Sequence, residues 1–332
     1  MSIINEFRED LVSGEWVLLA TGRAKRHSQF KDQGEEQKTT KDKCPFEDPE
    51  KSGNEVLATY QNQEKTDWAI KAIKNKFPAV LEGMNPKSSK SGPFKVTEGL
   101  GRHEVLVFKD HDKDLGQLEQ REVAQILRTY QERYISIYDH GSMKYVLIFH
   151  NHGPGSGASI EHPHSQIMSI PILPPDVKRS IGGADKFYKE NGKRVYDAMI
   201  EWEVKEKKRI VFENKHFIVF CPFVSKTPYE IRIFPKESRA HFEQMPEELM
   251  PALSEALHVT LKKVFVALDD PDYNFFIHTA PIAASHAHEF YTWHIEIIPR
   301  ISMIGAFELG SGVDVNVVDP DEAAKEFKEA KI

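Results

Sequence analysis

The chain has 332 residues and a mass of 38.0 kDa, enough for two domains of ordinary size or one large α/β domain. Hydrophobic residues make up 40% and charged residues 29% of it, values typical of a globular protein rather than of a disordered or fibrous chain. The net charge of −7 argues against a protein that coats nucleic acid, because such a surface is basic. It still allows a small phosphorylated substrate, which is bound by local charge.

The sequence also argues against a secreted or membrane protein. Its start, "MSIINEFRED", carries acids and lacks the apolar stretch of a signal peptide. No apolar run approaches the roughly 18 residues of a membrane span. The two cysteines, Cys44 and Cys221, are far apart, which disfavours a disulfide framework. We therefore expect a cytoplasmic protein with no membrane partner and no nucleic-acid partner.

The predicted elements follow the same order in both halves of the chain. In the first half, hydrophobic periodicity predicts a strand with a turn, a helix and two further strands: residues 103–118, 119–141, 144–153 and 162–172. In the second half it predicts the same series: residues 227–245, 246–268, 272–281 and 292–300. This repetition predicts an α+β fold, in which a unit of antiparallel strands with a crossing helix is duplicated and the halves divide near residues 185–200.

Four further segments have recognisable patterns. Residues 197–223 predict a helix that leads into a strand. The end of the chain, residues 320–332, predicts a terminal helix with acids early and lysines late, as the helix dipole favours. Residues 27–56 and 84–100 are polar and rich in lysine, so we expect mobile loops there.

Two histidines and a glutamine, His162, His164 and Gln166, occupy every second position directly after a glycine-rich loop. On a strand these three side chains point to one face. Glycines in residues 153–157 allow backbone amides to approach an anion closely. A neutral imidazole at such a loop can attack phosphorus and form a covalent intermediate. The same spacing also suits a metal pair, or packed and solvated histidines, so the residues themselves leave three interpretations open.

The segment "HPHSQ" with the preceding "HNHGPGSGAS" resembles the galactose-1-phosphate uridylyltransferases, the transferase branch of the histidine-triad superfamily. Other similar segments, in chain order, are "CPFEDPE", "KNKFPAV", "IHTAP" with "WHIEIIPR", and "GAFELGSG". The resemblance implies a duplicated histidine-triad-like fold, with the catalytic strand in residues 1–190 and a degenerate copy in residues 191–332. It also implies a homodimer.

The same resemblance implies a ping-pong reaction that exchanges UMP between UDP-glucose and a hexose 1-phosphate, for which galactose 1-phosphate is expected. His164 would be the nucleophile, and Gln166 would stabilise the transferring phosphoryl group. The positions that match nucleotide and phosphate contacts are Arg23, Arg26, Asn75, Phe77, Asn151, Gly157 and Ser159. Phe307 and Glu308 match a pair that contacts the sugar from the partner subunit.

The family commonly holds a structural zinc ion with two cysteines and two histidines. Here Cys44 retains one cysteine and Glu47 stands at the position of the other, while His111 and His162 are the expected partners. Carboxylates are accepted zinc ligands, so the resemblance implies Zn²⁺ in this set; the alternative is that zinc has been lost. Some members of the family have a second metal site, which many relatives lack. The positions that match it here are His278, His294 and Glu296.

Ser165 leaves the substrate open. The position after the nucleophile is often glycine in the family, and serine there also occurs in an ADP-glucose phosphorylase-like branch. The alternative functions are therefore a nucleotide-sugar phosphorylase or a dinucleoside polyphosphate phosphorylase that uses the same histidine. An inactive nucleotide-binding protein is a further alternative, against which the retention of His164 and Gln166 argues.

Overall fold

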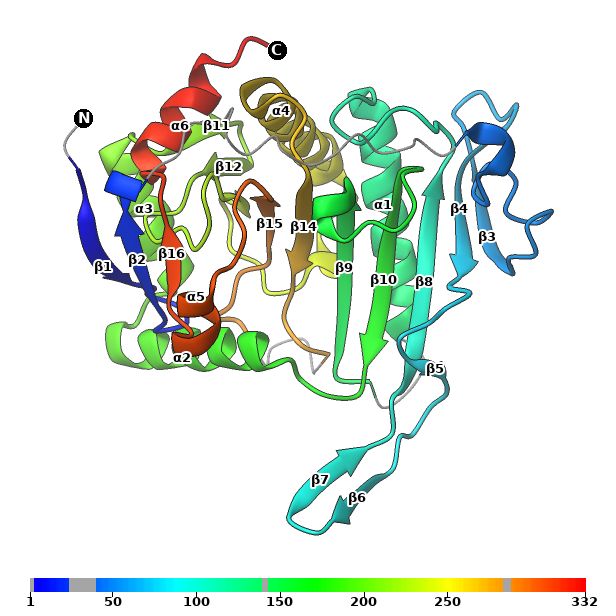
Figure 1. Cartoon of the computed structure of the whole chain (residues 1–332), viewed down its shortest axis with the longest axis horizontal. Coiled ribbons are helices and arrows are strands. Elements are labelled where there is room, and N and C mark those ends of the chain that lie inside the picture. Colours follow the sequence, from blue (N-terminus) through cyan, green and yellow to red (C-terminus); the bar gives the residue numbers. More distant parts are fainter. Residues whose placement is uncertain (1–2, 24–39, 139–142, 283–287) are drawn as a thin grey trace.

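The computed structural model describes residues 3–23, 40–138, 143–282 and 288–332. Its centre is an eleven-stranded sheet that is almost entirely antiparallel (Figure 1). From one edge to the other, the ten strands of the main path are β11 (Ile210–Glu213), β12 (Phe217–Phe220), β13 (Ile231–Pro235), β15 (His294–Pro299), β14 (Tyr273–His278), β9 (Tyr145–His152), β10 (His164–Ile170), β8 (Leu100–Phe108), β4 (Trp68–Lys74) and β3 (Val56–Gln61). The short strand β5 (Leu81–Glu82) pairs with β8 in parallel.

The strand order is mirrored about the centre of this sheet. From the centre outward, the first half of the chain contributes β9, β10, β8, β4 and β3, and the second contributes β14, β15, β13, β12 and β11. The two halves meet where β9 pairs with β14 in antiparallel register, Phe149 opposite Phe276. Helix α1 (Gln120–Tyr138) joins β8 to β9, and α4 (Met250–Leu268) joins β13 to β14. This mirrored order confirms the predicted α+β class and the duplicated unit.

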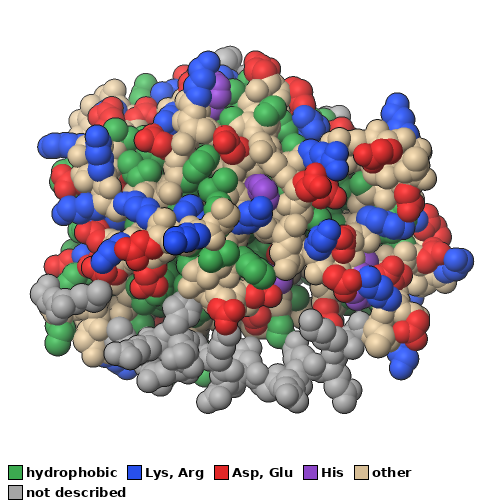
Figure 2. Space-filling model, turned by 90° about the horizontal axis from the view of Figure 1, so that it is seen from above, with side chains coloured by type: hydrophobic (Ala, Val, Ile, Leu, Met, Phe, Trp, Pro, Cys, Tyr) green, Lys and Arg blue, Asp and Glu red, His purple; other side chains and the backbone are tan. Residues whose placement is uncertain are grey.

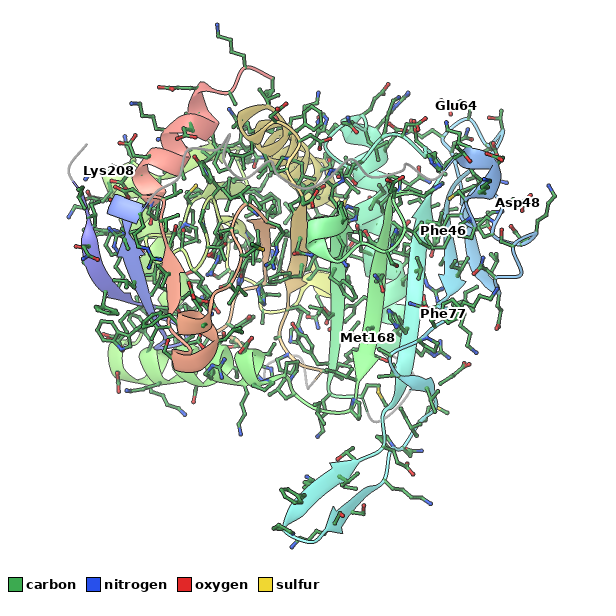
Figure 3. The ribbon with its side chains drawn as sticks, in the orientation of Figure 1. Phe46, Asp48, Glu64, Phe77, Met168 and Lys208 are labelled. Carbon is green, nitrogen blue, oxygen red and sulfur yellow. The ribbon has the colours of Figure 1, made fainter. Side chains whose placement is uncertain are left out.

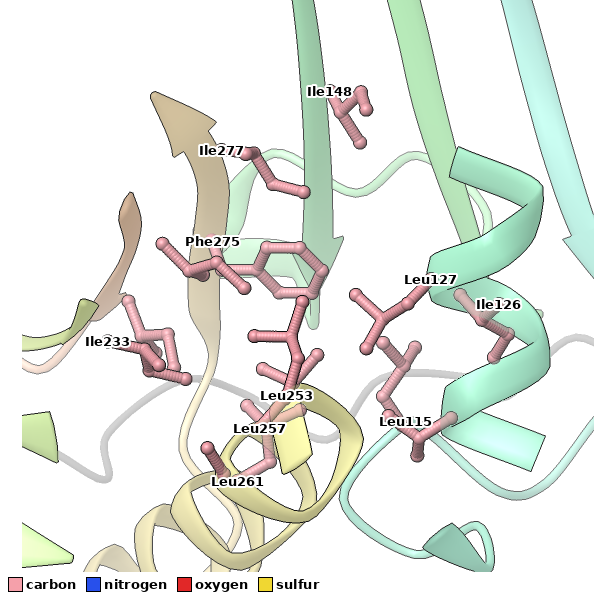
Figure 4. Packing of buried hydrophobic residues seen from close by; sticks show 14 of the residues in the cluster. Leu115, Ile126, Leu127, Ile148, Ile233, Leu253, Leu257, Leu261, Phe275 and Ile277 are labelled. Atoms are coloured by element: carbon pink, nitrogen blue, oxygen red, sulfur yellow. The ribbon is translucent and has the colours of Figure 1, made fainter. Parts of the chain in front are cut away.

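One apolar core lies under both halves, on what we call the back face of the sheet, where α1 and α4 pack. Alternation along β9 and β14 places Ile148 and Phe275 on this face. Leu127 of α1 and Leu253 of α4 approach Phe275 from the two helices (Figure 4). The predicted division at residue 190 falls in the last turn of helix α2 (Pro175–Asn191), and whether the halves fold as separate domains stays a prediction.

A smaller layer lies beside the second half of the sheet (Figure 1). Its three-stranded sheet consists of β1 (Asn5–Glu9), β2 (Trp16–Ala20) and β16 (Asp314–Asn316). The remaining α-helices are α2 (Pro175–Asn191), α3 (Val195–Glu206), α5 (Ala306–Ser311) and α6 (Pro320–Glu329). Short 3-10 helices cover Thr21–Arg23, Lys41–Lys43, Pro154–Ser156, Phe242–Gln244 and Glu247–Leu249.

One expectation for local structure was wrong, and one helix was missed. Residues 84–100, expected as a loop, contain a hairpin of β6 (Ser88–Ser91) and β7 (Phe94–Thr97) that projects from the body (Figure 1). A two-residue turn joins these strands, and Gly92 adopts the positive φ of +58° that such a turn favours. Helix α2 was not predicted. Of the other expected loop, residues 27–39 lie outside the described residues.

The surface carries charges of both signs. Figure 2 shows Lys and Arg side chains interspersed with Asp and Glu over the face that it presents. Among the helices that the structure describes, none combines the length and the apolar character required to cross a bilayer.

Candidate active site

Strand β10 places the predicted catalytic residues on the front face of the sheet, opposite α1 and α4. His164, Gln166 and Met168 alternate along this face, while Ser165 and Ile167 point to the back. In the antiparallel pairing with β8, His164 lies opposite Val107 and Gln166 opposite Val105. In Figure 3, Phe46, Phe77 and Met168 lie around β8 and β10. The front of β10 and its neighbours is therefore the candidate active site.

His164 is held in one tautomer by its own strand. Its Nδ1 lies 2.8 Å from the backbone carbonyl oxygen of His162, and since a carbonyl can only accept, Nδ1 carries the proton. Burial lowers the pKa of His164 to about 4, so the ring is neutral at neutral pH and Nε2 carries a lone pair. Phe46 packs edge-on against the ring, with centroids 5.2 Å apart. This arrangement matches what a nucleophilic imidazole requires.

Gln166 lies two residues further along the same face and is fixed by a hydrogen bond across the sheet. His103 Nε2 lies 2.7 Å from Gln166 Oε1. With the oxygen occupied by this contact, the Gln166 NH₂ group is available as a donor to a ligand. An uncharged donor beside a neutral nucleophile suits the binding of a phosphoryl oxygen.

The glycine-rich loop between β9 and β10 is shaped by close packing. Gly153 has a φ of +74°, and a Cβ at this position would lie 1.9 Å from Asp272 Oδ1. Asp272 Oδ2 accepts a 2.5 Å hydrogen bond from the backbone N–H of Gly155. Gly157 also has a positive φ, +89°. The loop therefore requires glycine at position 153 for two independent reasons, backbone conformation and space.

A cavity of about 790 Å³ borders this loop. Ser159, which was expected to bind phosphate, lines it, but so do Glu161, Asp270 and Asp272. Lys41 and His152 line the same cavity, so its lining carries both acidic and basic groups. The phosphate-binding role of Ser159 stays a prediction.

A buried polar network supports β10 from the back face. Ser165 Oγ lies 2.6 Å from Tyr130 Oη and 3.0 Å from His150 Nδ1. His150 Nε2 lies 2.9 Å from Asp114 Oδ1, and the Tyr273 hydroxyl donates to Asp114 Oδ2. The cationic and hydrogen-bonding partners outweigh burial and hold the pKa of Asp114 well below its usual range. This network ties the strand of the nucleophile to β9, β14 and α1.

The four residues of the expected zinc set converge beside the nucleophile. His162 Nδ1 lies 3.1 Å from His111 Nδ1 and 3.5 Å from Cys44 Sγ. Glu47 Oε1 lies 2.7 Å from His111 Nδ1 and 3.8 Å from His162 Nδ1. The other His162 nitrogen, Nε2, donates to the carbonyl of Phe108 at 2.6 Å, so Nδ1 faces the cluster with a lone pair. The thiol and the two imidazoles form one close group of ligand atoms, with the Glu47 carboxylate beside His111, and this donor set with its supporting hydrogen bond fits a zinc site.

The second expected metal set is also close together but is neutralised by an arginine. His278 Nε2 lies 2.9 Å from Glu296 Oε2, and the rings of His278 and His294 stack with centroids 4.6 Å apart. The Arg232 guanidinium lies 3.6 Å from the same Glu296 oxygen and is the main cause of the lowered pKa of Glu296. A cation already satisfies the carboxylate, so this set fits an ion-pair cluster better than a metal site.

Of the residues expected to contact the nucleotide, two lie in the turn beside His103. Asn75 is half-buried beside His103, with its Oδ1 accepting from the backbone N–H of Phe77 at 2.9 Å. Phe77 itself is 85% exposed, which leaves its ring free for a ligand. Arg23 is exposed, and Arg26 lies outside the described residues.

Asn151 lies on β9 and accepts a 2.7 Å hydrogen bond from Asn274 of β14. Asn274 also donates to the carbonyl of Ser156 at 2.9 Å, so this asparagine pair holds the glycine-rich loop to the centre of the sheet.

The expected sugar contacts lie away from β10 in a single chain. Phe307 and Glu308 belong to α5, a short helix with no buried residue. In Figure 1, β15, β14 and β9 separate α5 from β10. Their expected contact with the sugar from a partner subunit stays a prediction.

Sequence reasoning missed His103 and the network around Asp114 and His150. Their partners are distant in sequence: Gln166 lies 63 residues after His103, and Tyr273 lies 159 residues after Asp114. Alternation along β8 places His103 on the front face, and this was the one signal available.

Comparisons with known proteins agree with this geometry. A family model described as galactose-1-phosphate uridyl transferase, N-terminal domain, matches residues 2–174, and a model for a domain of unknown function (DUF4921) matches residues 100–330. ADP-glucose phosphorylase of Arabidopsis thaliana is 31% identical over 334 residues, covering 98% of this chain and 93% of that protein. The chain belongs to the galactose-1-phosphate uridylyltransferase family.

Family members of two named activities match over nearly the whole chain. Galactose-1-phosphate uridylyltransferase of Thermotoga maritima is 27% identical over 336 residues, with 98% of this chain and 99% of that protein covered. The structure of A. thaliana ADP-glucose phosphorylase with bound ADP-glucose has a TM-score of 0.83 at 29% identity, covering 99% of this chain and 100% of that chain. A uridylyltransferase structure has a TM-score of 0.74 at 26% identity, covering 98% and 97%. Nucleotidyl transfer or phosphorolysis is therefore the class of activity.

Proposed function

We propose that this protein transfers a nucleotidyl group from a nucleotide sugar through a covalent intermediate on His164. The observation that carries the proposal is the hydrogen bond from His164 Nδ1 to the carbonyl of His162. It leaves Nε2 unprotonated, and the low pKa of the buried ring keeps it so. A neutral imidazole in one fixed tautomer, with Nε2 unprotonated, has the form that a nucleophile requires, which supports this role over a structural one.

Two displacements complete the reaction. In the first, His164 Nε2 attacks the α-phosphorus of the nucleotide sugar, a P–N bond forms, and the bond to the bridging oxygen breaks. The sugar 1-phosphate leaves with that oxygen and its electron pair. In the second, a phosphate oxygen of the acceptor attacks the same phosphorus, and the P–N bond breaks. His164 then regains its neutral form with the proton still on Nδ1.

Gln166 serves both displacements. Its amide is two residues from His164 on the same face of β10, and its oxygen is engaged by His103. The NH₂ group donates to a non-bridging oxygen of the moving phosphoryl group, whose negative charge it stabilises without adding a fixed charge. Asn75 and Phe77 are placed by the turn beside His103 and would contact the base and ribose.

We propose UDP-glucose as the donor and a hexose 1-phosphate, galactose 1-phosphate first, as the acceptor. Phosphorolysis of ADP-glucose is the second candidate, and it is favoured by the match to an ADP-glucose phosphorylase at 31% identity over 98% of the chain. Ser165 supports the same candidate. The test combines each donor, UDP-glucose or ADP-glucose, with each acceptor, galactose 1-phosphate or inorganic phosphate, and separates the products by ion-exchange chromatography. UDP-galactose from UDP-glucose and galactose 1-phosphate supports the first; phosphate-dependent ADP release from ADP-glucose supports the second.

We further propose a homodimer in which α5 of one subunit reaches the sugar in the site of the other. Phe307 is half-exposed on this short helix, and α5 lies away from β10 of its own chain (Figure 1). Light scattering gives the oligomeric state. Mixing a His164→Ala chain with a Glu308→Ala chain tests the shared site, because only a mixed dimer contains one intact site.

We propose that Cys44, Glu47, His111 and His162 hold a structural Zn²⁺. Glu47 Oε1 is a buried atom that lies 2.7 Å from His111 Nδ1, and the Nδ1 atoms of His111 and His162 face each other at 3.1 Å, an arrangement that a shared cation would satisfy. Zinc would fix the loop that carries Phe46 against His164, and it takes no part in the displacements. Metal analysis of protein purified without added metal tests this. About one zinc per chain supports it, and less than about a tenth refutes it.

A further inference from the structure

His103 connects two parts of the candidate site that are far apart in sequence. On one side its Nε2 lies 2.7 Å from Gln166 Oε1. On the other side the backbone N–H of Ala79 donates to its Nδ1 at 3.2 Å. Ala79 closes the turn that begins at Asn75, and Asn75 N–H donates to the backbone carbonyl of His103 at 2.9 Å. The imidazole therefore lies between the phosphoryl donor and the turn that carries Phe77.

These contacts define the tautomer of His103. A backbone N–H can only donate, so Nδ1 must accept, and the single proton of the neutral ring is on Nε2. Burial lowers the pKa of His103, which agrees with a neutral ring. The Asn75 amide nitrogen lies 3.2 Å from Nε2 and 3.5 Å from Nδ1, so this contact does not decide the tautomer, whereas the Ala79 contact does.

The tautomer of His103 in turn decides which way the Gln166 amide faces. An Nε2–H donor selects the carbonyl oxygen of the amide and would oppose its NH₂ group. The NH₂ group is thereby directed away from His103. A glutamine without this neighbour has two amide orientations that differ by a 180° rotation, and only one of them offers a donor to a phosphoryl oxygen.

We infer that His103 is a positioning residue, which fixes the Gln166 amide with its NH₂ group toward the reacting phosphoryl group and couples that amide to the nucleotide-contacting turn of residues 75–79. This inference rests on the proposed function, in which Gln166 stabilises the phosphoryl group as it moves. His103 touches neither the substrate nor the reacting phosphorus; it acts through Gln166.

The test compares His103→Phe, which keeps a ring and removes both nitrogens, with His103→Gln, which keeps one donor and one acceptor. Rapid-quench measurement of the covalent intermediate gives its rate of formation and the donor concentration for half-maximal rate. We expect His103→Phe to slow formation of the covalent intermediate about 10- to 100-fold, because a Gln166 amide that faces the wrong way cannot donate to the phosphoryl group. This loss should not exceed the loss in Gln166→Ala. The half-maximal concentration should rise by a smaller factor than the rate falls, because the turn also loses the Ala79 contact, and His103→Gln should stay within about fivefold of the parent.

A double-mutant cycle separates positioning through Gln166 from an independent effect. In the Gln166→Ala background, His103→Phe should add less than about a twofold loss, since the group on which it acts is gone. His258→Leu, which removes a partly buried histidine from α4, is the control for losing an imidazole elsewhere. Circular dichroism and the unfolding midpoint monitor the fold, and His103→Leu replaces His103→Phe if the phenyl ring is not accommodated.

The inference is overturned if the rate losses of His103→Phe and Gln166→Ala multiply in the double variant. It is also overturned if His103→Phe forms the intermediate at the parent rate while Gln166→Ala is slow. In both cases the proposed function stands. A full rate in Gln166→Ala overturns the role of Gln166 in the proposed function, and this inference with it. Absence of a covalent intermediate in the parent protein refutes the proposed function directly.

Discussion

Asp114→Asn removes the buried charge beneath the catalytic strand while keeping the shape of the side chain. In the parent protein the Asp114 carboxylate interacts with His150 Nε2 at 2.9 Å and with His152 Nδ1 at 3.3 Å, and it accepts from the Tyr273 hydroxyl. The asparagine can accept with its one oxygen, but its NH₂ group then opposes a donor. Because each hydrogen bond to a buried charged group contributes about 1.5–3 kcal/mol and the asparagine cannot replace all of them, we expect the free energy of unfolding to fall by about 3 kcal/mol at pH 7.

The loss should depend on pH in a defined direction. The native-state pKa of Asp114 lies below its usual value, so its contribution is complete above the unfolded pKa of about 3.9 and is lost as the pH falls toward the native pKa. The gap between parent and variant should therefore shrink by about 1 kcal/mol at pH 3.

Urea unfolding followed by circular dichroism at pH 7, 5 and 3 measures this gap. Asp176→Asn is the control, because Asp176 is exposed on α2 and pairs with Arg179, an interaction worth less than about 1 kcal/mol. An Asp114→Asn loss below about 1 kcal/mol at pH 7, or a gap that does not change with pH, would contradict the network described for the back face.

Three further predictions address the loop, the phosphoryl donor and the metal set. Gly153→Ala should lower the unfolding free energy by about 2–4 kcal/mol, because its Cβ would meet Asp272. Gly53→Ala is the control, since Gly53 also has a positive φ but lies in open space, and it should cost about 1 kcal/mol. Equal losses in urea unfolding would contradict the close approach of Gly153 to Asp272. Gln166→Ala should slow both half-reactions about 100-fold in rapid-quench assays, and a loss in only one of them would disprove its shared role. Cys44→Ser should reduce bound zinc by at least about 10-fold in metal analysis, and an unchanged content would exclude Cys44 as a ligand.

Local patterns predicted most of the sheet and its crossing helices. The alternation of His162, His164 and Gln166 predicted one face of a strand, and β10 confirms that His164 and Gln166 share the front face. Periodicity predicted α1 and α4, because their apolar residues recur at helical spacing, and acids early with lysines late predicted α6. The resemblance named Cys44, Glu47, His111 and His162 as one set, and the fold brings their ligand atoms together.

The remaining features depend on contacts between distant segments. Helix α2 contains Gly182 and Gly183, which disfavour a helix by about 1 kcal/mol each. A Cβ at Gly183 would lie 1.8 Å from the Val12 carbonyl oxygen, so the glycine allows the N-terminal segment to pack closely. The pairing of His103 with Gln166 requires the register between β8 and β10, which no local pattern supplies.

The central claim is that His164 carries the nucleotidyl group, and intact-protein mass spectrometry tests it most directly. The protein is incubated briefly with UDP-glucose or ADP-glucose, without acceptor, and quenched at alkaline pH, where a phosphohistidine survives. We expect a mass increase of one nucleotidyl group with one of the two donors, and no increase in His164→Ala. No adduct with either donor, or an adduct that persists in His164→Ala, would contradict this claim.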